Sequence, residues 1–313
     1  MKKVIFATFV IIILNPLIAG AVLIEPKFSI DPASPAIDGN ITPDDVLVAG
    51  PSVHTQGRDL GLQDDFFSGF YDNLNALSYG QDPITNPLFF SVDRVAVGLP
   101  GTAVNSQAQP GVEEAAGDVY TTLPPFGSNN LFIDEQQLGL TPVFFGDDLD
   151  ALELDTEPIP YTYFSIDSLS ASNGFGTGGL DDDILFSDGT GSFQIFAEGI
   201  SNIGLGFGDD LDALALWDVF EPGTLNPGID KALFSISTFS ASAFTVVSPA
   251  DILFTDFTGN FSLWASAADI GLRFDDEVDA LDTVPEPATI TLMAIGFAGL
   301  GFHRYRLRRK NIS

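Results

Sequence analysis

The sequence contains no cysteine and only two histidines among its 313 residues. A disulfide scaffold, a thiolate metal site and a cysteine nucleophile are therefore excluded. Positive charge is also scarce, with 12 Lys and Arg against 43 Asp and Glu. Because phosphate binding needs clustered basic side chains, neither nucleic acid nor an anionic membrane surface is an expected partner. Apolar residues are plentiful: 45% of the chain is hydrophobic and 12% is aromatic, which is enough to bury a core.

Most of the basic residues lie at the two ends of the chain. Residues 25–286 contain all 43 acidic residues but only five basic ones. These five are Lys27, Arg58, Arg94, Lys231 and Arg273. The central part of the chain is therefore a polyanion, whose self-repulsion bound cations would relieve.

The N-terminal segment has the features of a signal peptide. Lys2 and Lys3 precede a short apolar run, and Ala19 and Ala21 supply the small residues that signal peptidase needs at its cleavage site. We expect a signal peptide over residues 1–21, cleavage after its last residue, and export. The alternative is an uncleaved membrane anchor, although the apolar run is shorter than the roughly 20 residues that span a bilayer.

The other end of the chain has three consecutive parts. They are the residues Val284, Pro285, Glu286 and Pro287, an apolar stretch over 288–302, and a basic end with Arg304, Arg306, Arg308 and Arg309. The prolines keep the first part extended, the apolar stretch can enter a bilayer as a short transmembrane segment, and the basic end favours the cytoplasmic side. Over residues 284–313, this order resembles the PEP-CTERM sorting signal of Gram-negative bacteria.

The resemblance implies a route for the protein. An exosortase recognises such a signal near Pro285–Pro287, the tail is lost, and the body is released or transferred to the outer surface. The resemblance also implies a host that makes extracellular polysaccharide, so exopolysaccharide and other biofilm components are expected neighbours. The membrane is then contacted only through the tail, before processing. A plain C-terminal anchor is the alternative, although 15 apolar residues are short for a stable span.

Residues 22–283 contain an internal repeat with four landmarks. A Phe-Ser pair followed by a β-branched residue begins at Phe28, Phe90, Phe164 and Phe234. An Asp followed by a β-branched residue is found at Asp45, Asp118, Asp183 and Asp251. A Gly between aliphatic residues is found at Gly61, Gly139, Gly204 and Gly271. An acidic or amide pair then begins at Asp72, Asp147, Asp209 and Asp276, with successive spacings of 75, 62 and 67 residues. The four units are therefore about 28–82, 90–155, 164–218 and 234–282.

Short apolar runs in each unit have the two-residue period of a β-strand. Phe193, Ile195 and Ala197, for example, are expected to share one face. The runs are rich in Phe, Ile, Val and Thr, and turn residues such as Asp188 and Gly189 separate them. Helical periodicity over 11 or more residues is absent outside the two ends.

We therefore predict an all-β body. Each unit offers about four strands: the Phe-Ser run, the Asp-Ile-Leu run, the run before the Gly and the Ala-Leu run. Four units of about 60–75 residues, each too small to bury its own apolar face, favour a four-bladed β-propeller with Phe packed between blades. Two β-sandwich domains of two units each would produce the same local pattern.

The fourth landmark supplies candidate metal ligands. Its acidic residues are Asp147, Asp148, Asp150, Asp209, Asp210, Asp212, Asp276, Glu277 and Asp279, while the first unit has Asp72, Asn73 and Asn75. Residues i and i+2 of a strand project to one face, so Asp148 and Asp150 can present their oxygens side by side. Oxygen ligands suit Ca²⁺, although the spacing is not that of an EF-hand. The alternative is that these are solvated turn residues that repeat because the unit repeats.

No catalytic site is predicted. His54 lies in a polar stretch typical of an exposed loop, and no carboxylate pair stands out from the repeats. We expect a non-catalytic cell-surface or matrix protein, with Ca²⁺ as a structural ion. Exposed aromatic residues such as Tyr71, Tyr79 or Tyr120 could stack on sugar rings. The alternative is a secreted glycan-cleaving hydrolase that uses paired carboxylates.

Overall fold

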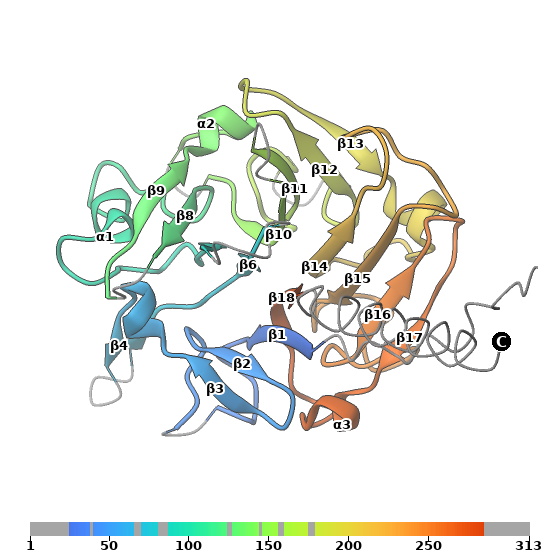
Figure 1. Cartoon of the computed structure of the whole chain (residues 1–313), viewed down its shortest axis with the longest axis horizontal. Coiled ribbons are helices and arrows are strands. Elements are labelled where there is room, and N and C mark those ends of the chain that lie inside the picture. The colour runs from blue at the N-terminus through green and yellow to red at the C-terminus, as the bar shows by residue number, and fades with distance from the viewer. Residues whose placement is uncertain are drawn as a thin grey trace, which may run out of the picture. The chain divides into compact units, whose positions relative to one another are not determined.

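We describe a computed structural model, in which residues 25–37, 40–65, 70–80, 87–123, 127–143, 146–155, 160–174 and 179–284 are placed. Sixteen of its strands form four antiparallel sheets of four strands, arranged around a common centre (Figure 1). This arrangement is a four-bladed β-propeller. The predicted all-β body with four blades is confirmed, and the two-sandwich alternative is wrong.

The strands of each blade are named here from the centre outwards. Blade 1 contains β18 (Val278–Val284), β1 (Glu25–Ile30), β2 (Val46–Val48) and β3 (Ser52–Thr55). Blade 2 contains β6 (Ala76–Ser78), β7 (Leu88–Ser91), β8 (Val119–Thr122) and β9 (Asn130–Ile133). Blade 3 contains β10 (Leu149–Asp155), β11 (Tyr161–Ile166), β12 (Ile184–Ser187) and β13 (Phe193–Ala197). Blade 4 contains β14 (Leu211–Trp217), β15 (Lys231–Ile236), β16 (Ile252–Thr255) and β17 (Phe261–Ala265). A separate two-stranded sheet contains β4 (Asp64–Asp65) and β5 (Phe70–Tyr71).

The innermost strand of each blade comes from the preceding sequence unit. β18, at the end of the fourth unit, pairs with β1 so that Glu25 lies opposite Val284 and Phe28 lies opposite Leu281. The first and last strands of the body thereby close the ring within one sheet. Blade borders differ by one strand from the borders of the sequence units, because each Ala-Leu run crosses into the next blade.

Apolar side chains are buried in four clusters, each of which joins two neighbouring blades. The Phe of the first landmark is completely buried in every unit, and each cluster contains one of these four rings. Burying such a side chain contributes about 2–3 kcal/mol to the free energy of unfolding. The Ser that follows also links blades: Ser165 Oγ donates to the Leu211 carbonyl at 2.7 Å, and Ser235 Oγ to the Val278 carbonyl at 2.7 Å. The Phe-Ser pair is therefore a blade-packing signal.

One helical turn follows the outermost strand of each blade. These turns are η2 (Gly57–Leu60), α2 (Glu135–Leu138), η3 (Gly199–Ile203) and α3 (Ala267–Ile270), while α1 (Ala103–Gln107) lies in the β7–β8 connection. The Asp of the second landmark accepts a hydrogen bond from the start of the turn, as Asp183 does from the Gly199 amide at 2.8 Å. The Gly of the third landmark ends the turn. Gly204 has a φ of 94°, and a Cβ there would lie 2.8 Å from the Gly259 carbonyl oxygen of the next blade. The run before each Gly is thus part strand and part helical turn.

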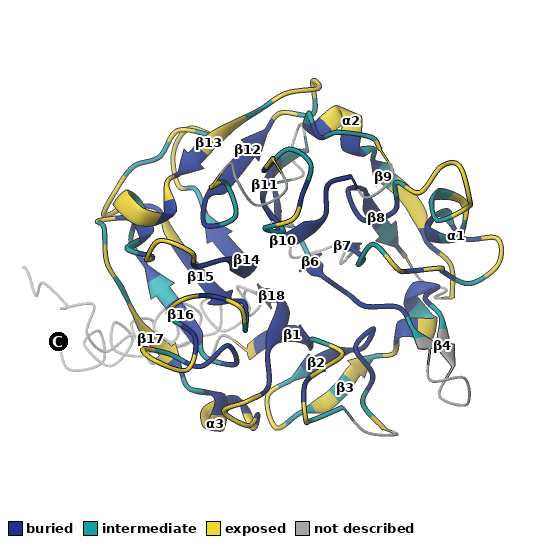
Figure 2. Cartoon of the chain, turned by 180° about the vertical axis from the view of Figure 1, so that it is seen from behind, coloured by how far each residue is buried: buried dark blue, intermediate teal, exposed yellow. Residues whose placement is uncertain are grey.

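The alternation predicted for Phe193, Ile195 and Ala197 is wrong. β12 and β13 pair with a register shift, because Ile184 lies opposite Ala197 while Leu185 lies opposite Ile195. The extra residue, Phe196, is buried, and Ile195 is exposed. A β-bulge reverses the face of the following residues, which a two-residue period cannot show. Figure 2 shows that the outermost strands β13 and β17 carry exposed residues.

Candidate cation site in the central channel

A cavity of about 400 Å³ lies where the innermost strands begin. Figure 2 shows these strands, β6, β10, β14 and β18, around the centre of the ring. Nine carboxylates from all four sequence units line the cavity, together with one basic side chain, Arg94. The repeat therefore concentrates negative charge on the axis of the propeller.

The structure brings together six of the nine predicted ligands. These six are buried and line the channel: Asp148, Asp150, Asp210, Asp212, Glu277 and Asp279. They occupy the second and fourth positions of the acidic landmark, at the start of β10, β14 and β18. The amides Asn73 and Asn75 occupy the same two positions before β6. The solvated-turn alternative is wrong for these residues, because their side chains are buried.

The first residue of each acidic landmark has a different environment. Asp209 Oδ1 accepts a hydrogen bond from the Ser242 amide at 2.7 Å, and its Oδ2 accepts from the Gly206 amide at 2.7 Å and from Ser242 Oγ at 2.8 Å. Asp147 and Asp276 also accept hydrogen bonds from backbone amides on two sides. These three carboxylates tie loops together and do not line the channel cavity.

Three carboxylates of the channel were not predicted from the sequence. Asp31, Asp93 and Asp167 line the cavity, and each lies two residues after the Ser of the Phe-Ser landmark. In the fourth unit Ser237 occupies this position. The pattern Phe-Ser, β-branched residue, Asp is visible in the sequence in three units. Its role becomes visible only in the fold, where the end of the second strand of a blade lies beside the start of the innermost strand.

Burial and mutual repulsion raise the pKa of Asp150 and Asp212 in the channel. The pKa of Asp150 is raised by burial and then by the nearby charges of Asp210 and Asp148. The pKa of Asp212 is raised by burial and then by Glu277 and Asp279. Full ionisation of six buried and three half-buried carboxyls would be costly, and either bound protons or bound cations would lower that cost.

One built-in cation partly neutralises the channel. Arg94 Nη1 lies 2.9 Å from Asp167 Oδ1 and 3.3 Å from Asp148 Oδ2. Its Nη2 donates to Ser170 Oγ at 3.3 Å. The guanidinium therefore pairs with two of the nine carboxylates.

Three carboxylates lie close enough to share a cation. One oxygen each from Asp150, Asp167 and Asp210 lies within 4.8 Å of the other two. Buried oxygens of Asp210, Asp212 and Asp279 also lack a hydrogen-bond partner among the described residues. An unsatisfied buried carboxylate oxygen is costly, and a hard cation takes oxygen ligands of this kind. The donor set of the channel therefore fits Ca²⁺.

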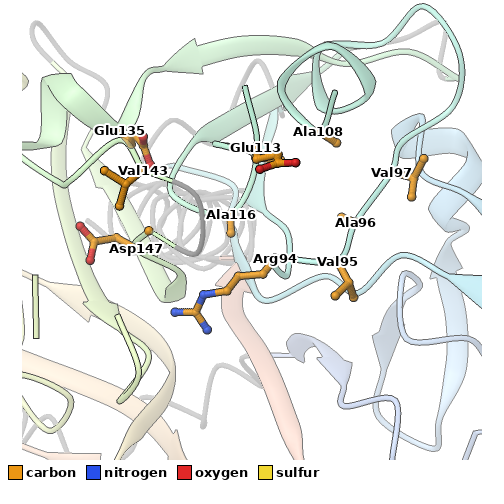
Figure 3. Close-up of a pocket in the computed structure, with 12 residues that line it drawn as sticks. Arg94, Val95, Ala96, Val97, Ala108, Glu113, Ala116, Glu135, Val143 and Asp147 are labelled. Atoms are coloured by element: carbon orange, nitrogen blue, oxygen red, sulfur yellow. The ribbon is translucent and has the colours of Figure 1, made fainter. Parts of the chain in front are cut away.

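A second cavity, of about 230 Å³, lies beside the channel and is lined by apolar side chains and by Arg94, Glu135 and Asp147 (Figure 3). Glu135 is buried, and its Oε1 has no hydrogen-bond partner among the described residues. Burial and the charges of neighbouring acids raise its pKa to about 9. Burial also raises the pKa of the nearby Asp118 to about 7. Glu135 therefore keeps its proton at neutral pH.

The histidine and the tyrosines named from the sequence lie in different environments. His54 is exposed, as expected, but lies on the outermost strand β3 and not in a loop. Tyr120 is completely buried, and its hydroxyl donates to the Ala115 carbonyl at 3.1 Å, so it cannot stack on a sugar. Tyr71 and Tyr79 are half-buried.

The predicted processing sites lie outside the described residues, apart from Val284 at the end of β18. They are Ala19, Ala21, Pro285, Glu286, Pro287, Arg304, Arg306, Arg308 and Arg309, together with the apolar segment 288–302. Among the helices that the structure describes, none is long and apolar enough to cross a bilayer. The signal peptide and the short transmembrane segment therefore remain predictions.

Comparison with known families gives one match. No curated protein matches the chain. Residues 283–309 match the family model of the PEP-CTERM protein-sorting motif, which confirms the resemblance read from the tail. The motif implies processing by an exosortase, export, and anchoring by the C-terminus before processing. The chain thus carries a PEP-CTERM sorting motif that begins at the end of the strand that closes its β-propeller.

Proposed function

We propose that the protein is a non-catalytic cell-surface or extracellular-matrix module, delivered by an exosortase and stabilised by Ca²⁺. The position of the sorting motif carries this proposal. The motif begins at residue 283, and β18, which closes the ring against β1, ends at Val284. Cleavage beyond this strand would leave all sixteen blade strands in the released body. A cut before β18 would remove the innermost strand of blade 1 and expose the edge of β1.

Contact with exopolysaccharide is supported by two exposed aromatic rings. Phe207 is 92% exposed and Phe239 is 93% exposed. Their loops are joined by a hydrogen bond from the Ala241 amide to the Gly208 carbonyl at 2.9 Å, and Phe239 also lines the channel cavity. Exposed aromatic faces offer apolar contact to sugar rings, so these phenylalanines replace the tyrosines expected from the sequence.

The experiment follows the protein in its own host. Wild-type chain and a variant with Pro285→Ala and Pro287→Ala are compared by fractionation, with Pro222→Ala as the control. We expect the double variant to stay in the inner-membrane fraction while the control reaches the cell surface or the medium. An equal distribution of all three chains would overturn sorting at this motif.

Binding to the purified exopolysaccharide of the host is then measured for the released protein. Phe207→Ala with Phe239→Ala should weaken binding at least about tenfold, since two stacking contacts are lost. Phe220→Ala is the matched control, because Phe220 is 68% exposed but follows the far end of β14. An equal loss of exopolysaccharide binding in Phe220→Ala would contradict the proposed contact.

A secreted glycan-cleaving hydrolase is the second candidate, and Glu135 is the observation that favours it. A carboxyl that keeps its proton at neutral pH inside a cavity is what a general acid requires. The test is a reducing-sugar assay on the same exopolysaccharide with wild type and Glu135→Gln. Product that forms with wild type and disappears with the variant would replace the non-catalytic proposal.

A further inference from the structure

We infer that the channel holds one divalent cation, of the Ca²⁺ class, on Asp150, Asp167 and Asp210, and that Arg94 acts as a built-in cation in the adjoining equivalent position. This inference rests on the proposed function for the presence of Ca²⁺. It adds the location, the number of ions and the reason why only one of four similar positions is used.

The four-fold repeat creates four equivalent positions around the channel. Each position combines three side chains. The first lies at the start of an innermost strand, the second follows the second strand of the same blade, and the third precedes the innermost strand of the next blade. The four sets are Asp150, Asp167 and Asp210; Asp212, Ser237 and Glu277; Asp279, Asp31 and Asn73; and Asn75, Asp93 and Asp148. Only the first set contains three carboxylates.

In each of the other three positions an amide, a hydroxyl group or an arginine neutralises part of the charge, while Asp212 and Asp279 each keep one oxygen without a hydrogen-bond partner among the described residues. Both oxygens of Glu277 accept hydrogen bonds from Thr238, one from its amide and one from its hydroxyl. Asp279 is hydrogen bonded by the Asn73 side chain. These replacements of a carboxylate by an amide or a hydroxyl group lower the local charge and occupy oxygens that a metal would need.

The fourth position contains the arginine. Arg94 pairs with Asp148 Oδ2 at 3.3 Å, and the Asn75 amide donates to Asp148 Oδ1 at 3.2 Å. A guanidinium cannot lose its proton in a protein, so the charge at this position is permanent. Arg94 also contacts Asp167 Oδ1 at 2.9 Å, which places it beside the three-carboxylate position.

The three-carboxylate position has the features that a metal requires. Its ligand oxygens lie within 4.8 Å of one another, and Asp210 Oδ1 is buried without a hydrogen-bond partner among the described residues. The cavity of about 400 Å³ also leaves room for the waters that complete the shell of a divalent cation. Carboxylate oxygens together with water are the ligands of hard cations of the Ca²⁺ class.

The test measures Ca²⁺ binding to the full chain, purified in detergent and treated with chelator, by titration calorimetry and by metal analysis. Wild type should bind one Ca²⁺ in this channel. Asp150→Asn and Asp210→Asn should each weaken binding at least about tenfold, because each removes a ligand. Asp279→Asn is the matched control: Asp150 and Asp279 are each 6% exposed, and Asp279 also has an orphan oxygen, but it lies in a neutralised position. The control should change affinity less than about threefold.

Replacement of the arginine tests the built-in cation. Arg94→Gln should raise the number of bound Ca²⁺ ions from one to two, whereas Arg94→Lys should keep it at one. A single ion in Arg94→Gln would overturn the role given to Arg94. Equal weakening by Asp279→Asn and Asp150→Asn would overturn the assigned location while leaving Ca²⁺ stabilisation intact. No binding at all to wild type would instead overturn Ca²⁺ stabilisation itself.

Discussion

Asp209 and Asp212 lie three residues apart in one acidic landmark, yet their environments are opposite. Asp209 accepts three hydrogen bonds from two loops. Asp212 faces the channel, where burial and neighbouring acids raise its pKa and one of its oxygens lacks a partner among the described residues. The same residue type therefore stabilises the fold at one position and carries a cost at the other. Whether an Asp stabilises or destabilises the folded state therefore depends on the hydrogen-bond donors around it, and not on the number of acids.

The comparison also explains why the repeat retains both carboxylates. The first carboxylate of the landmark joins two loops by hydrogen bonds at the end of the blade where the innermost strand begins. It therefore stabilises the fold directly. The second and fourth carboxylates are costly for the isolated chain, and buried acids with raised pKa values that line a cavity are candidates for a functional site. The channel is therefore a candidate ligand site.

The larger of the two effects in this comparison is expected at the hydrogen-bonded position. Asp209→Asn should lower the free energy of unfolding by about 3 kcal/mol, because an amide cannot accept all three hydrogen bonds and places its own donors against backbone amides. Urea unfolding of the full chain measures the change. A loss below about 1 kcal/mol would show that the two loops are held by other contacts.

A smaller effect of opposite sign is expected in the channel. Asp212→Asn should raise the free energy of unfolding by about 1 kcal/mol in excess chelator, because it removes a buried charge among like charges. The same unfolding measurement applies. If both Asn variants destabilised the protein equally, the contrast between the two positions would be lost.

The third prediction concerns how the free energy of unfolding depends on pH through the cavity beside the channel. The pKa of Glu135 is raised from 4.5 to about 9, so the folded state keeps a proton that the unfolded state has lost. The free energy of unfolding should therefore fall as pH rises from about 4.5 to 9, since the native state binds more protons in this window. Asp118, with its pKa raised to about 7, adds to the slope in the lower half of the window.

Glu135→Gln should flatten this dependence, and exposed Glu221→Gln is the control that should not. Thermal unfolding between pH 5 and 9 measures both slopes. Identical slopes for wild type and Glu135→Gln would contradict the raised pKa. The acids that face Glu135 and add to its shift are Asp118, Glu114, Asp147 and Asp134.

Much of the architecture could be predicted from the repeats. Phe28 and its three counterparts indicated packing between blades, and the all-β body with four blades followed from the alternating runs. The blade borders could not be predicted in the same way. The Ala-Leu run joins the next blade, and only the pairing of β18 with β1 reveals this offset.

The candidate site was only partly predictable. Spacing predicted that Asp148 with Asp150, and Asp210 with Asp212, present their oxygens side by side, but it predicted no channel and could not separate them from Asp147 and Asp209. Whether an adjacent Asp accepts backbone hydrogen bonds depends on loops about 30 residues away, such as the one that contains Ser242. Asp167 was missed because its partner Asp210 lies in another blade.

The sequence alone determined the polyanionic body, the four units and the sorting tail, because composition, periodicity and a contiguous motif are local properties of a chain. The tertiary structure decided which acids meet on the axis, which are satisfied by amides, and why Arg94 serves only two of them. These outcomes depend on distances between blades. Electrostatic energy in a buried channel changes steeply with such distances, and no order of residues along the chain records them.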